Sequence, residues 1–460
     1  MSTAQSSGHL TDGDSPELRA TVSKAAKRLI PFLGLLYFIN YLDRTNIAFA
    51  GPNGMNRDLG LNATQFGIAS GLFFIGYLIL EVPSNIMLHK VGARRWIARI
   101  MVSWGIVATA FAFVPNTTWL YILRLVLGIA EAGFFPGIIL YLTYWFPQRD
   151  RAKYTALFMT AIPISSALGA TVSSLIIQYS HGQIFGLAGW RSMFMLEGIP
   201  AVILGVVCWF FLTDNPRAAK WLKPNEQELL QAQLDLEHQE KESTYQVTMG
   251  QALAMPRVWA LSFVYFGGVY GLYSLSFFMP SIVAGFKNEY QVQWSVVEQG
   301  LVTAIPYVCG LVAMLFWSRR SDRTGERVWH NVIPLTIGAL LIPITSYMPG
   351  PVSKMALLSV VTMCIMAFLP TFWSLPTAFL TGASAATGIA LVNSIGNLSG
   401  FAGPYITGYL KDLTGTDRAG MYAIGIAMII AAVITLILKA APAPKDPDPS
   451  KMVKGGHGAH

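Results

Sequence analysis

The sequence predicts an all-α integral membrane protein with twelve transmembrane helices arranged as two six-helix bundles. Hydrophobic residues make up 53% of the 460 residues and charged residues only 12%, whereas soluble domains average about 25% charged residues. Apolar runs of about 20 residues, long enough to cross a bilayer, recur along the chain. One long polar interruption, residues 214–256, divides these runs into two sets of six. A soluble fold is therefore excluded.

The expected spans and regions follow directly from these runs. In chain order the spans are 29–48, 66–88, 96–114, 119–146, 153–179, 191–212, 258–285, 299–318, 331–348, 355–377, 383–410 and 419–438. The regions are a cytoplasmic amino-terminal tail at 1–27, a first bundle at 28–213, a cytoplasmic central loop at 214–256, a second bundle at 257–440 and a disordered cytoplasmic tail at 441–460. Disorder is expected in that tail because it is rich in proline and glycine.

Lysine and arginine are distributed unevenly between the two sides of the predicted membrane. With alternating spans, 24 of them fall on the side of the termini and 6 on the other side. Because loops rich in these residues stay in the cytoplasm, both termini are predicted to be cytoplasmic. The same asymmetry explains the net charge of +8, and no nucleic-acid partner is expected because no basic stripe is interleaved with aromatic residues. A removable signal peptide is not expected, because the first 27 residues are polar and no cleavage pattern follows.

The three cysteines carry no sign of a metal site or a disulfide framework. Cys208, Cys309 and Cys364 all lie within apolar runs and do not have metal-ligand spacing. We therefore expect ordinary buried thiols, with no metal and no cofactor.

The fourth span contains two charges that are expensive to bury. Within the apolar stretch Leu123–Phe146 stand Arg124 and Glu131, and each costs roughly 2.5–3.5 kcal/mol at the centre of a bilayer. Seven residues correspond to about 700° of helical turn, so both side chains lie on nearly the same face. Gly128 and Ala130 between them leave that face open. This pattern indicates a helix that lines a polar cavity in a membrane transporter.

The first span carries the other pair of charges, Asp43 and Arg44. Tyr41 and Tyr37 precede Arg44 by three and seven residues and therefore share its face. The two charges could simply neutralise each other near the membrane surface. We favour a functional role, because two arginines and two carboxylates on only two helices exceed what packing requires. Once 24 and 6 of the 32 lysines and arginines are assigned to the two sides of the membrane, only Arg44 and Arg124 are left, and they are placed at membrane depth.

Other polar residues in the spans give weaker signals. Glu81 and Glu197 are interpreted as structural pairing residues, with a functional role as the alternative. The expected spans of the second bundle contain no Asp, Glu, Lys or Arg, so neutral side chains must shape that half. Aromatic stripes are more typical of packing, and Asn393 and Asn397, one helical turn apart, are better candidates for substrate contact.

Two loops after corresponding helices carry the same order of residues. The first reads HKVGAR from position 89 and the second reads DRTGER from position 322. Such an echo at half-chain spacing is typical of transporters built from related halves. The glycine in each loop permits a tight turn. We predict that residues of these loops gate the transporter; the alternative is that their basic residues only set the membrane topology. The candidate gating residues are Lys90, Gly92, Arg94, Arg95, Asp322, Arg323, Gly325 and Arg327.

Several stretches resemble one known family. They are YFINYLDRTNIAFA, GYLILEVPSNIMLHKVGARRW, RLVLGIAEAGFFPGIILYLTYWFP, GWRSMFMLEGIPA and LVNSIGNLSGFAGP. With them the chain, from about Arg28 to Lys439, is similar to major facilitator superfamily transporters, in the anion:cation symporter branch of tartrate, phthalate, hydroxyphenylacetate and galactonate permeases. His89 departs from the pattern, because the superfamily loop commonly has Asp there. The resemblance implies two bundles that rock around a midplane site and import a carboxylate with protons across the bacterial inner membrane.

The resemblance also implies roles for individual residues. Asp43 and Glu131 correspond to proton-carrying carboxylates, and Arg44 and Arg124 to partners of the substrate anion. Tyr41, Tyr77 and an asparagine of the eleventh helix correspond to the binding cavity.

The partners implied are a small organic anion, protons and the lipid bilayer, and the protein is expected to be a monomer. Sugar acids, hydroxy diacids and aromatic acids would all satisfy two arginines. Two alternatives remain: a uniporter or exporter of another solute class, and a membrane sensor or intramembrane enzyme. The second lacks support, because the sequence shows no nucleophile and base constellation and no signalling domain, so an enzyme is not expected.

Overall fold

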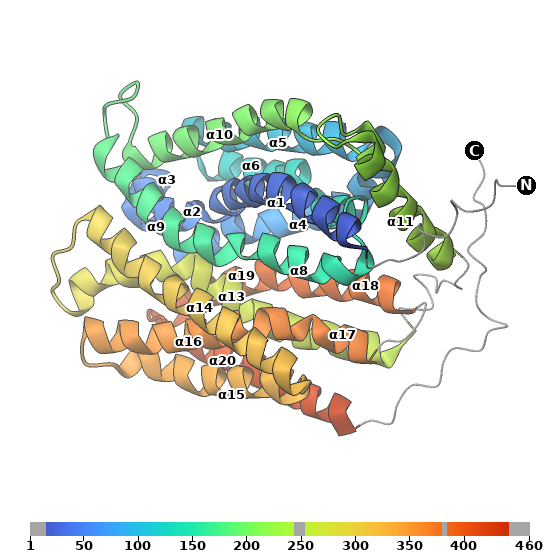
Figure 1. Ribbon diagram of the computed structural model, residues 1–460. Coiled ribbons are helices and arrows are strands. Elements are labelled where there is room, and N and C mark those ends of the chain that lie inside the picture. Colours follow the sequence, from blue (N-terminus) through green and yellow to red (C-terminus); the bar gives the residue numbers. More distant parts are fainter. Residues whose placement is uncertain (1–14, 243–253, 380–383, 441–460) are drawn as a thin grey trace, which may run out of the picture.

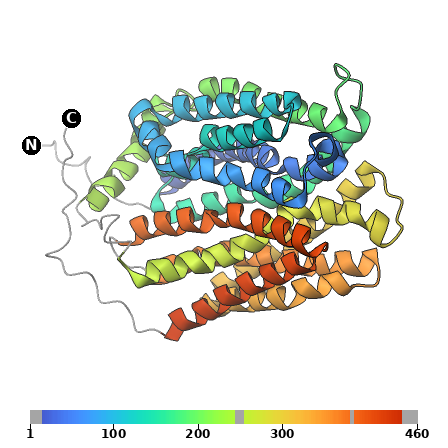
Figure 2. The same ribbon diagram turned by 180° about the vertical axis from the view of Figure 1, so that it is seen from behind.

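The structure is a computed structural model that describes residues 15–242, 254–379 and 384–440, and in those residues every regular element is helical. Two bundles lie against each other (Figure 1). The helices up to α10 form one bundle and those from α13 onward form the other, and the reverse view gives the same division (Figure 2). The predicted all-α fold with two helical bundles is confirmed.

The first bundle contains the first six expected spans, with several helices divided into consecutive segments. Its elements are α1 (Pro16–Thr45), α2 (Ile47–Ala50), η1 (Gly51–Met55), α3 (Asn56–Leu59), α4 (Ala63–Val91), α5 (Ala93–Ala110), η2 (Phe111–Phe113), α6 (Thr117–Glu131), α7 (Phe134–Thr143), α8 (Gln148–Met159), α9 (Ala161–Tyr179) and α10 (Gly189–Phe211).

The central loop and the second bundle complete the chain. Their elements are η3 (Pro216–Ala218), α11 (Pro224–Glu242), α13 (Pro256–Glu289), α14 (Val296–Thr324), α15 (Val328–Ile344), η4 (Thr345–Tyr347), α16 (Pro351–Phe372), α17 (Ser374–Phe379), α18 (Ser384–Asn397), α19 (Ser399–Thr414) and α20 (Arg418–Ala440).

Length and composition mark 10 helices of the described chain as able to cross a membrane. The first and eleventh expected spans are not among them. The first span lies in α1, which buries Asp43 and Arg44, and the eleventh is divided into the two short helices α18 and α19. Both nevertheless lie within their bundles beside the longer helices (Figure 1).

Helix α1 begins well before the expected span. Ser15 caps it by accepting a hydrogen bond from the backbone nitrogen of Leu18 at 3.2 Å, and Pro16 occupies the first turn, which are the preferred residues for a helix start. The ammonium of Lys24 then bonds Glu226 of α11 at 2.7 Å. Residues 16–27, expected to belong to a tail, are therefore part of α1, and Lys24 joins this part of the helix to the central loop.

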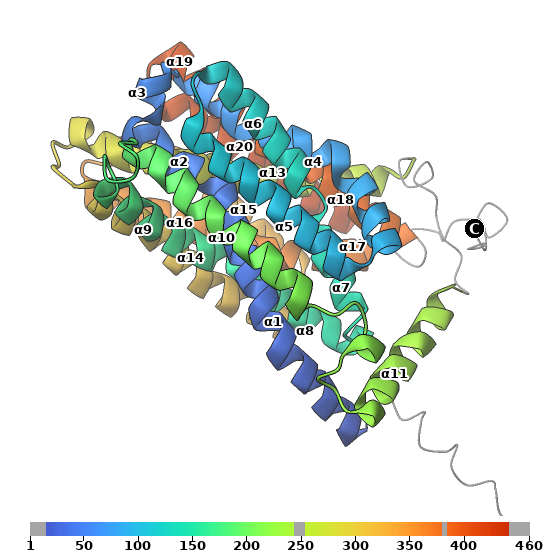
Figure 3. The same cartoon turned by 90° about the horizontal axis from the view of Figure 1, so that it is seen from above.

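We call the end of the molecule where α1 begins and α11 lies the α11 end, and the opposite end the far end (Figure 3). The central loop also attaches to α8 at the α11 end, since the Gln148 backbone nitrogen donates to Glu237 at 2.9 Å. Helix α11 thus bonds to two helices of the first bundle.

The fourth helix is interrupted rather than continuous. Helix α6 ends at Glu131 and α7 begins at Phe134. Between them Gly133 adopts a φ of +85°, and a Cβ there would lie 2.2 Å from the Ser84 hydroxyl oxygen. Only glycine fits this conformation and this approach without strain. The break places Glu131 at a helix end.

Two glycines bring α6 against α4. A Cβ on Gly128 would lie 2.0 Å from the Phe73 carbonyl oxygen, and one on Gly76 would lie 2.2 Å from the Leu125 carbonyl oxygen. Small residues at such positions let membrane helices approach closely. Because α4 and α6 lie this close together, Phe73 of α4 lies beside Arg44 of α1 and Arg124 of α6.

The far end is sealed by contacts between the two bundles. Asp412 of α19 accepts hydrogen bonds from the backbone nitrogens of Ala63 at 3.1 Å and Thr64 at 2.7 Å, at the start of α4. On the other side of the interface the Val297 nitrogen donates to Gln178 at 3.0 Å. We call these two contacts the far-end seal.

Replacing Gly128 by alanine should destabilise the protein, because the added methyl group meets the α4 backbone. Overpacking of this kind costs about 1–3 kcal/mol, and we expect a lower melting temperature in detergent. Gly285→Ala in α13 is the matched control, since a Cβ there meets nothing within 4 Å. Equal melting temperatures for the two variants would contradict the close approach.

Candidate functional site

A small cavity lies between the two bundles and brings together several of the predicted site residues. It has a volume of about 60 Å³, which gives room for a few water molecules. Its lining comprises Tyr37, Tyr41 and Arg44 of α1; Phe73, Phe74 and Tyr77 of α4; Phe135, Met159 and Ile162; Tyr265, Val269, Leu272 and Tyr273 of α13; and Leu369, Trp373, Asn393 and Asn397. Asp43, Arg124 and Glu131 do not line it.

Arg44 forms a buried ion pair with Glu131 of α6. Its Nε donates to Glu131 Oε1 at 3.1 Å, and its Nη2 bonds the same oxygen. Glu131 is fully buried, while Arg44 reaches the cavity wall. The carboxylate on Arg44's own helix is therefore not its partner, so Asp43 and Arg44 do not neutralise each other. The ion pair holds the break of the fourth helix against α1.

Asp43 points to a different neighbour. Its Oδ2 accepts a hydrogen bond from the indole nitrogen of Trp104 on α5 at 2.8 Å. Its Oδ1 is buried without a partner among the described residues. Sequence reasoning missed Trp104, because nothing in the apolar run around it shows that its indole meets a carboxyl group.

Arg124 is directed at the backbone of α4. Its Nε donates to the Ala69 carbonyl at 2.9 Å and its Nη2 to the Ser70 carbonyl at 3.1 Å. Its Nη1 has no partner among the described residues. This is a packing contact in the present conformation, and it leaves one donor of the guanidinium unused.

Phe73 lies beside both arginines and was also missed. The guanidinium carbons of Arg44 and Arg124 lie 5.0 Å and 5.4 Å from the centre of its ring, within the range of cation–π attraction. The Tyr77 ring lies 5.4 Å from the Arg44 guanidinium carbon. The aromatic side of α4 therefore stabilises positive charge at the site.

The second bundle contributes neutral hydrogen-bonding groups. The amide nitrogen of Asn393 donates to Glu81 Oε1 at 3.2 Å, and the hydroxyl of Ser394 donates to Glu81 Oε2 at 3.4 Å. The Tyr273 hydroxyl donates to Asn397 at 3.4 Å. Glu81, interpreted as a structural pairing residue, thus has its partners on the opposite bundle. Both predicted asparagines lie at the cavity.

Glu197 lies away from the cavity and pairs within the first bundle. Its Oε1 accepts a hydrogen bond from the Ser173 hydroxyl at 2.7 Å. It is buried and absent from the cavity wall. Its contact is that of a residue that joins α9 to α10.

The loop that carries the predicted gating residues of the second half is a compact turn. Gly325 ends α14 with a φ of +67°, and Arg327 Nη1 donates to Asp322 at 2.7 Å. Glu326 accepts from the Trp329 backbone nitrogen at 2.8 Å and so caps α15. Burial raises the pKa of Glu326, but the hydrogen bonds from Trp329 and His330 outweigh it and leave that pKa below its ordinary value. The cap is therefore ionised at neutral pH.

The first-half loop is organised by an aspartate from another segment. Gly92 has a φ of +95°, and Asp214 Oδ1 accepts from the Arg94 backbone nitrogen at 2.8 Å. Sequence reasoning missed Asp214, which lies 120 residues further along the chain. The side chain of His89 lies outside the described residues. Three further candidates, Lys90, Arg95 and Arg323, are exposed.

Comparison with known proteins decides the family. The profile of the Major Facilitator Superfamily matches residues 33–404 and, in an overlapping match, 289–458. The chain belongs to this superfamily. A candidate tartrate transporter from Agrobacterium vitis is 48% identical over 415 residues, 90% of each chain. A quinolone resistance transporter from Acinetobacter baumannii is 37% identical over 413 residues, which cover 90% of this chain and 93% of that one.

A solved structure agrees in fold. A bacterial homologue of the human lysosomal transporter Spinster, in an inward-facing and occupied conformation, superimposes with a TM-score of 0.68 at 17% identity and covers 93% of this chain and 98% of that one. The family match and the relatives, rather than this structure, show that the chain is a multi-pass membrane transporter and not an enzyme, and they confirm the resemblance stated from its motifs. The two bundles match the twelve-helix arrangement of the superfamily.

The buried ion pair should show strong energetic coupling. Removing one partner of a buried pair costs about 3–5 kcal/mol, whereas replacing both by apolar residues often costs little. Arg44→Met and Glu131→Met alone should each lower the melting temperature in detergent markedly, and the double variant should recover most of the loss. Strictly additive losses would contradict the pairing.

Proposed function

We propose that this protein is a proton-coupled symporter that imports a small organic carboxylate anion, such as a tartrate-like hydroxy acid, a sugar acid or an aromatic acid. It works by alternating access in the bacterial inner membrane, as a monomer with both termini and the α11 end in the cytoplasm. Bacterial relatives such as the candidate tartrate transporter support the substrate class. The main structural support for this proposal is the buried ion pair between Glu131 and Arg44, a residue that lines the cavity between the bundles.

The anion site is assigned to Arg44 with the neutral groups around it. A guanidinium offers a forked set of donors that matches a carboxylate and remains charged when buried. Tyr41, Tyr77, Asn393 and Asn397 line the same cavity and supply hydroxyl and amide groups. The cavity has room for a few water molecules only, so the bundles must separate slightly to admit a four-carbon acid.

Proton coupling is assigned to competition for Arg44. While Glu131 is ionised it occupies the guanidinium of Arg44. Protonation removes the negative charge of Glu131 and frees Arg44 for the substrate carboxylate. After the proton leaves, Glu131 again competes with the substrate and favours its release. Because Arg44 can pair with either Glu131 or the substrate carboxylate, binding of a proton to Glu131 raises the affinity for the substrate, and the two ligands are coupled.

Asp43 and Arg124 are assigned supporting roles in the same device. Asp43 is a second carboxyl group that can carry a proton, held toward α5 by Trp104. Arg124 has one unused donor and adds positive charge beside Phe73. When the bundles move, that donor is available to a substrate anion.

A second candidate function is uniport or export of another solute class. The relative that is a quinolone resistance transporter favours it, since that protein is 37% identical over most of both chains. The two candidates differ in their response to a pH gradient, because export or uniport does not need protons to enter with the solute.

Uptake into proteoliposomes tests the proposal. With an acid-outside pH gradient we expect several-fold faster uptake of at least one carboxylate from a panel of hydroxy diacids, sugar acids and aromatic acids. Glu131→Gln should abolish this stimulation, because the side chain can no longer lose a proton. Glu197→Gln is the matched control, because it changes a buried glutamate that bonds Ser173 of its own bundle, whereas Glu131 bonds Arg44. A lack of stimulation for every acid would refute symport.

Opening of the far-end seal is the conformational step that admits substrate from outside. Asp412→Ala removes the acceptor for the Ala63 and Thr64 nitrogens and should shift the protein toward far-end opening. The reporter is Ser174→Cys, because Ser174 is buried and faces Gly300 of the other bundle. A membrane-impermeant maleimide added on the far side should label it several-fold faster in the Asp412→Ala background.

Asp417→Ala provides the control for this labelling experiment. Asp417 pairs with Lys411 of the same bundle at 2.8 Å, so its loss removes an acidic group without breaking a contact between bundles. Equal labelling rates in the two backgrounds would remove Asp412 from the seal.

A further inference from the structure

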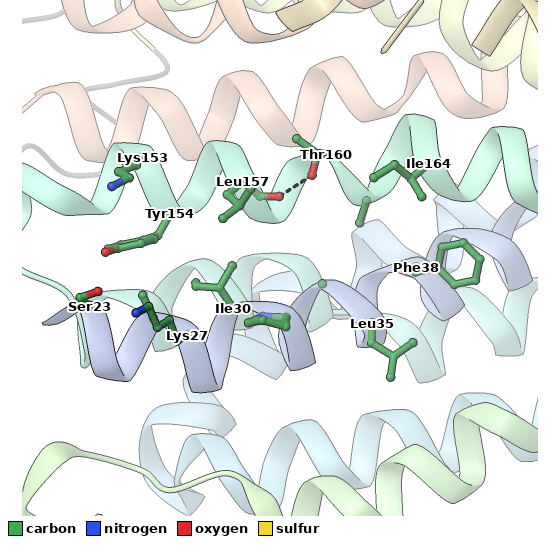
Figure 4. Close-up of a pocket in the computed structure, with 14 residues that line it drawn as sticks. Ser23, Lys27, Ile30, Leu35, Phe38, Lys153, Tyr154, Leu157, Thr160 and Ile164 are labelled. Atoms are coloured by element: carbon green, nitrogen blue, oxygen red, sulfur yellow. Dashed lines mark hydrogen bonds between the residues drawn. The ribbon is translucent and has the colours of Figure 1, made fainter. Parts of the chain in front are cut away.

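A groove on the first bundle is much larger than the cavity between the bundles. It holds about 700 Å³ between α1 and the helix pair α8 and α9. Figure 4 shows its two walls. Most of the lining is apolar, and Leu35, Leu157 and Ile164 remain exposed. Tyr37 and Tyr41 face the cavity between the bundles instead, so the two spaces lie on different sides of α1.

Positive charge is concentrated at one end of this groove. Lys27 on α1 and Lys153 on α8 lie on facing walls at its α11 end, with Ser23 beside them (Figure 4). Both lysines are exposed. Neither forms an ion pair with a carboxylate of the described residues. The neighbouring Asp150 is engaged by Arg149 at 3.2 Å, so the mouth of the groove keeps its positive charge.

The apolar part of the groove has the length of one membrane leaflet. From Lys27 to Phe38, and from Lys153 to Ile164, each wall runs eleven residues, which corresponds to about 16 Å of helix. Half the hydrocarbon thickness of a bilayer is about 15 Å. Thr160 does not interrupt the apolar wall, because its hydroxyl donates to the Leu157 carbonyl at 2.6 Å. A chain seated at the lysines therefore reaches the bilayer centre at the other end.

The floor of the groove is open at one residue of α1. A Cβ on Gly34 would meet no atom within 4 Å. The space above it is therefore free for a ligand rather than filled by a neighbouring helix. It also means that a larger side chain can occupy the groove without disturbing the protein.

We propose that this groove is a binding site for an anionic glycerophospholipid of the leaflet on the α11 side. The phosphate lies between Lys27 and Lys153, and one acyl chain lies along α1 past Gly34. Basic pockets between membrane helices suit anionic headgroups, and each lysine near the surface contributes about 1 kcal/mol. The ligand must carry both an anionic headgroup and an acyl chain, because the groove offers positive charge at one end and only apolar contact along the rest.

Lipid titration of the purified, delipidated full-length protein, followed by native mass spectrometry, tests the site. Phosphatidylglycerol should bind, and phosphatidylethanolamine with the same acyl chains should bind more weakly. Lys27→Ala with Lys153→Ala should weaken phosphatidylglycerol binding about 30-fold, and either change alone about 5-fold. Gly34→Leu should weaken binding of the lipid while leaving the melting temperature unchanged or higher.

Two controls separate the site from its alternatives. Lys220→Ala with Lys223→Ala removes two positive charges outside the groove, and it should leave phosphatidylglycerol binding within about twofold of the unaltered protein. Glycerol phosphate, the soluble headgroup analogue, should not displace the lipid at millimolar concentration. Unchanged lipid binding in the Lys27 and Lys153 variant, equal loss in the control variant, or displacement by glycerol phosphate would each overturn the proposal. None of these results depends on transport activity or on proton coupling.

Discussion

The buried ion pair between Arg44 and Glu131 is the constraint on which the rest of the site depends. Neither charge could stay at this depth alone, because an unpaired buried charge costs several kcal/mol. The pair joins α1 to the end of α6, next to the break of the fourth helix at Gly133. The close approach of α4 and α6 at Gly128 then brings the Phe73 ring to the Arg44 guanidinium. The position of the ion pair therefore depends both on the end of α6 and on the close packing of α4 against α6.

The two bundles play different physical parts. The first carries the charges, and it satisfies them mostly by itself, through the ion pair and through the carbonyl groups that receive Arg124. The second supplies rings and amides. Contacts across the interface at the cavity are therefore hydrogen bonds, such as that between Asn393 and Glu81, whose net worth is about 0.5–3 kcal/mol. Bundles joined in this way can separate without breaking a buried ion pair.

The sequence alone predicts the bundles and the chemical identity of the site, but not its pairings. Charges within apolar runs are conspicuous because burying them is expensive, so Arg44, Arg124 and Glu131 stand out. The partners of buried polar groups do not stand out. The carbonyl groups that receive Arg124 have no sequence signal, and Glu81 lies 312 residues from its partner Asn393. Hydropathy alone also does not mark the start of α1, since the helix begins at Pro16, before the apolar run, behind a Ser15 cap. The break at Gly133 was equally invisible, because the apolar run continues through it.

Helix α1 is shared by the cavity and the groove, and this limits what a lipid in the groove can do. Arg44 faces the cavity, whereas Lys27 and Leu35 face the groove. Both walls of the groove belong to the first bundle, so a lipid there binds α1 to α8 and does not connect the two bundles. Rocking of one bundle against the other leaves such a lipid in place. Its effect should therefore fall on the rigidity of the first bundle, which keeps Arg44 and Glu131 aligned, rather than on the equilibrium between inward and outward states.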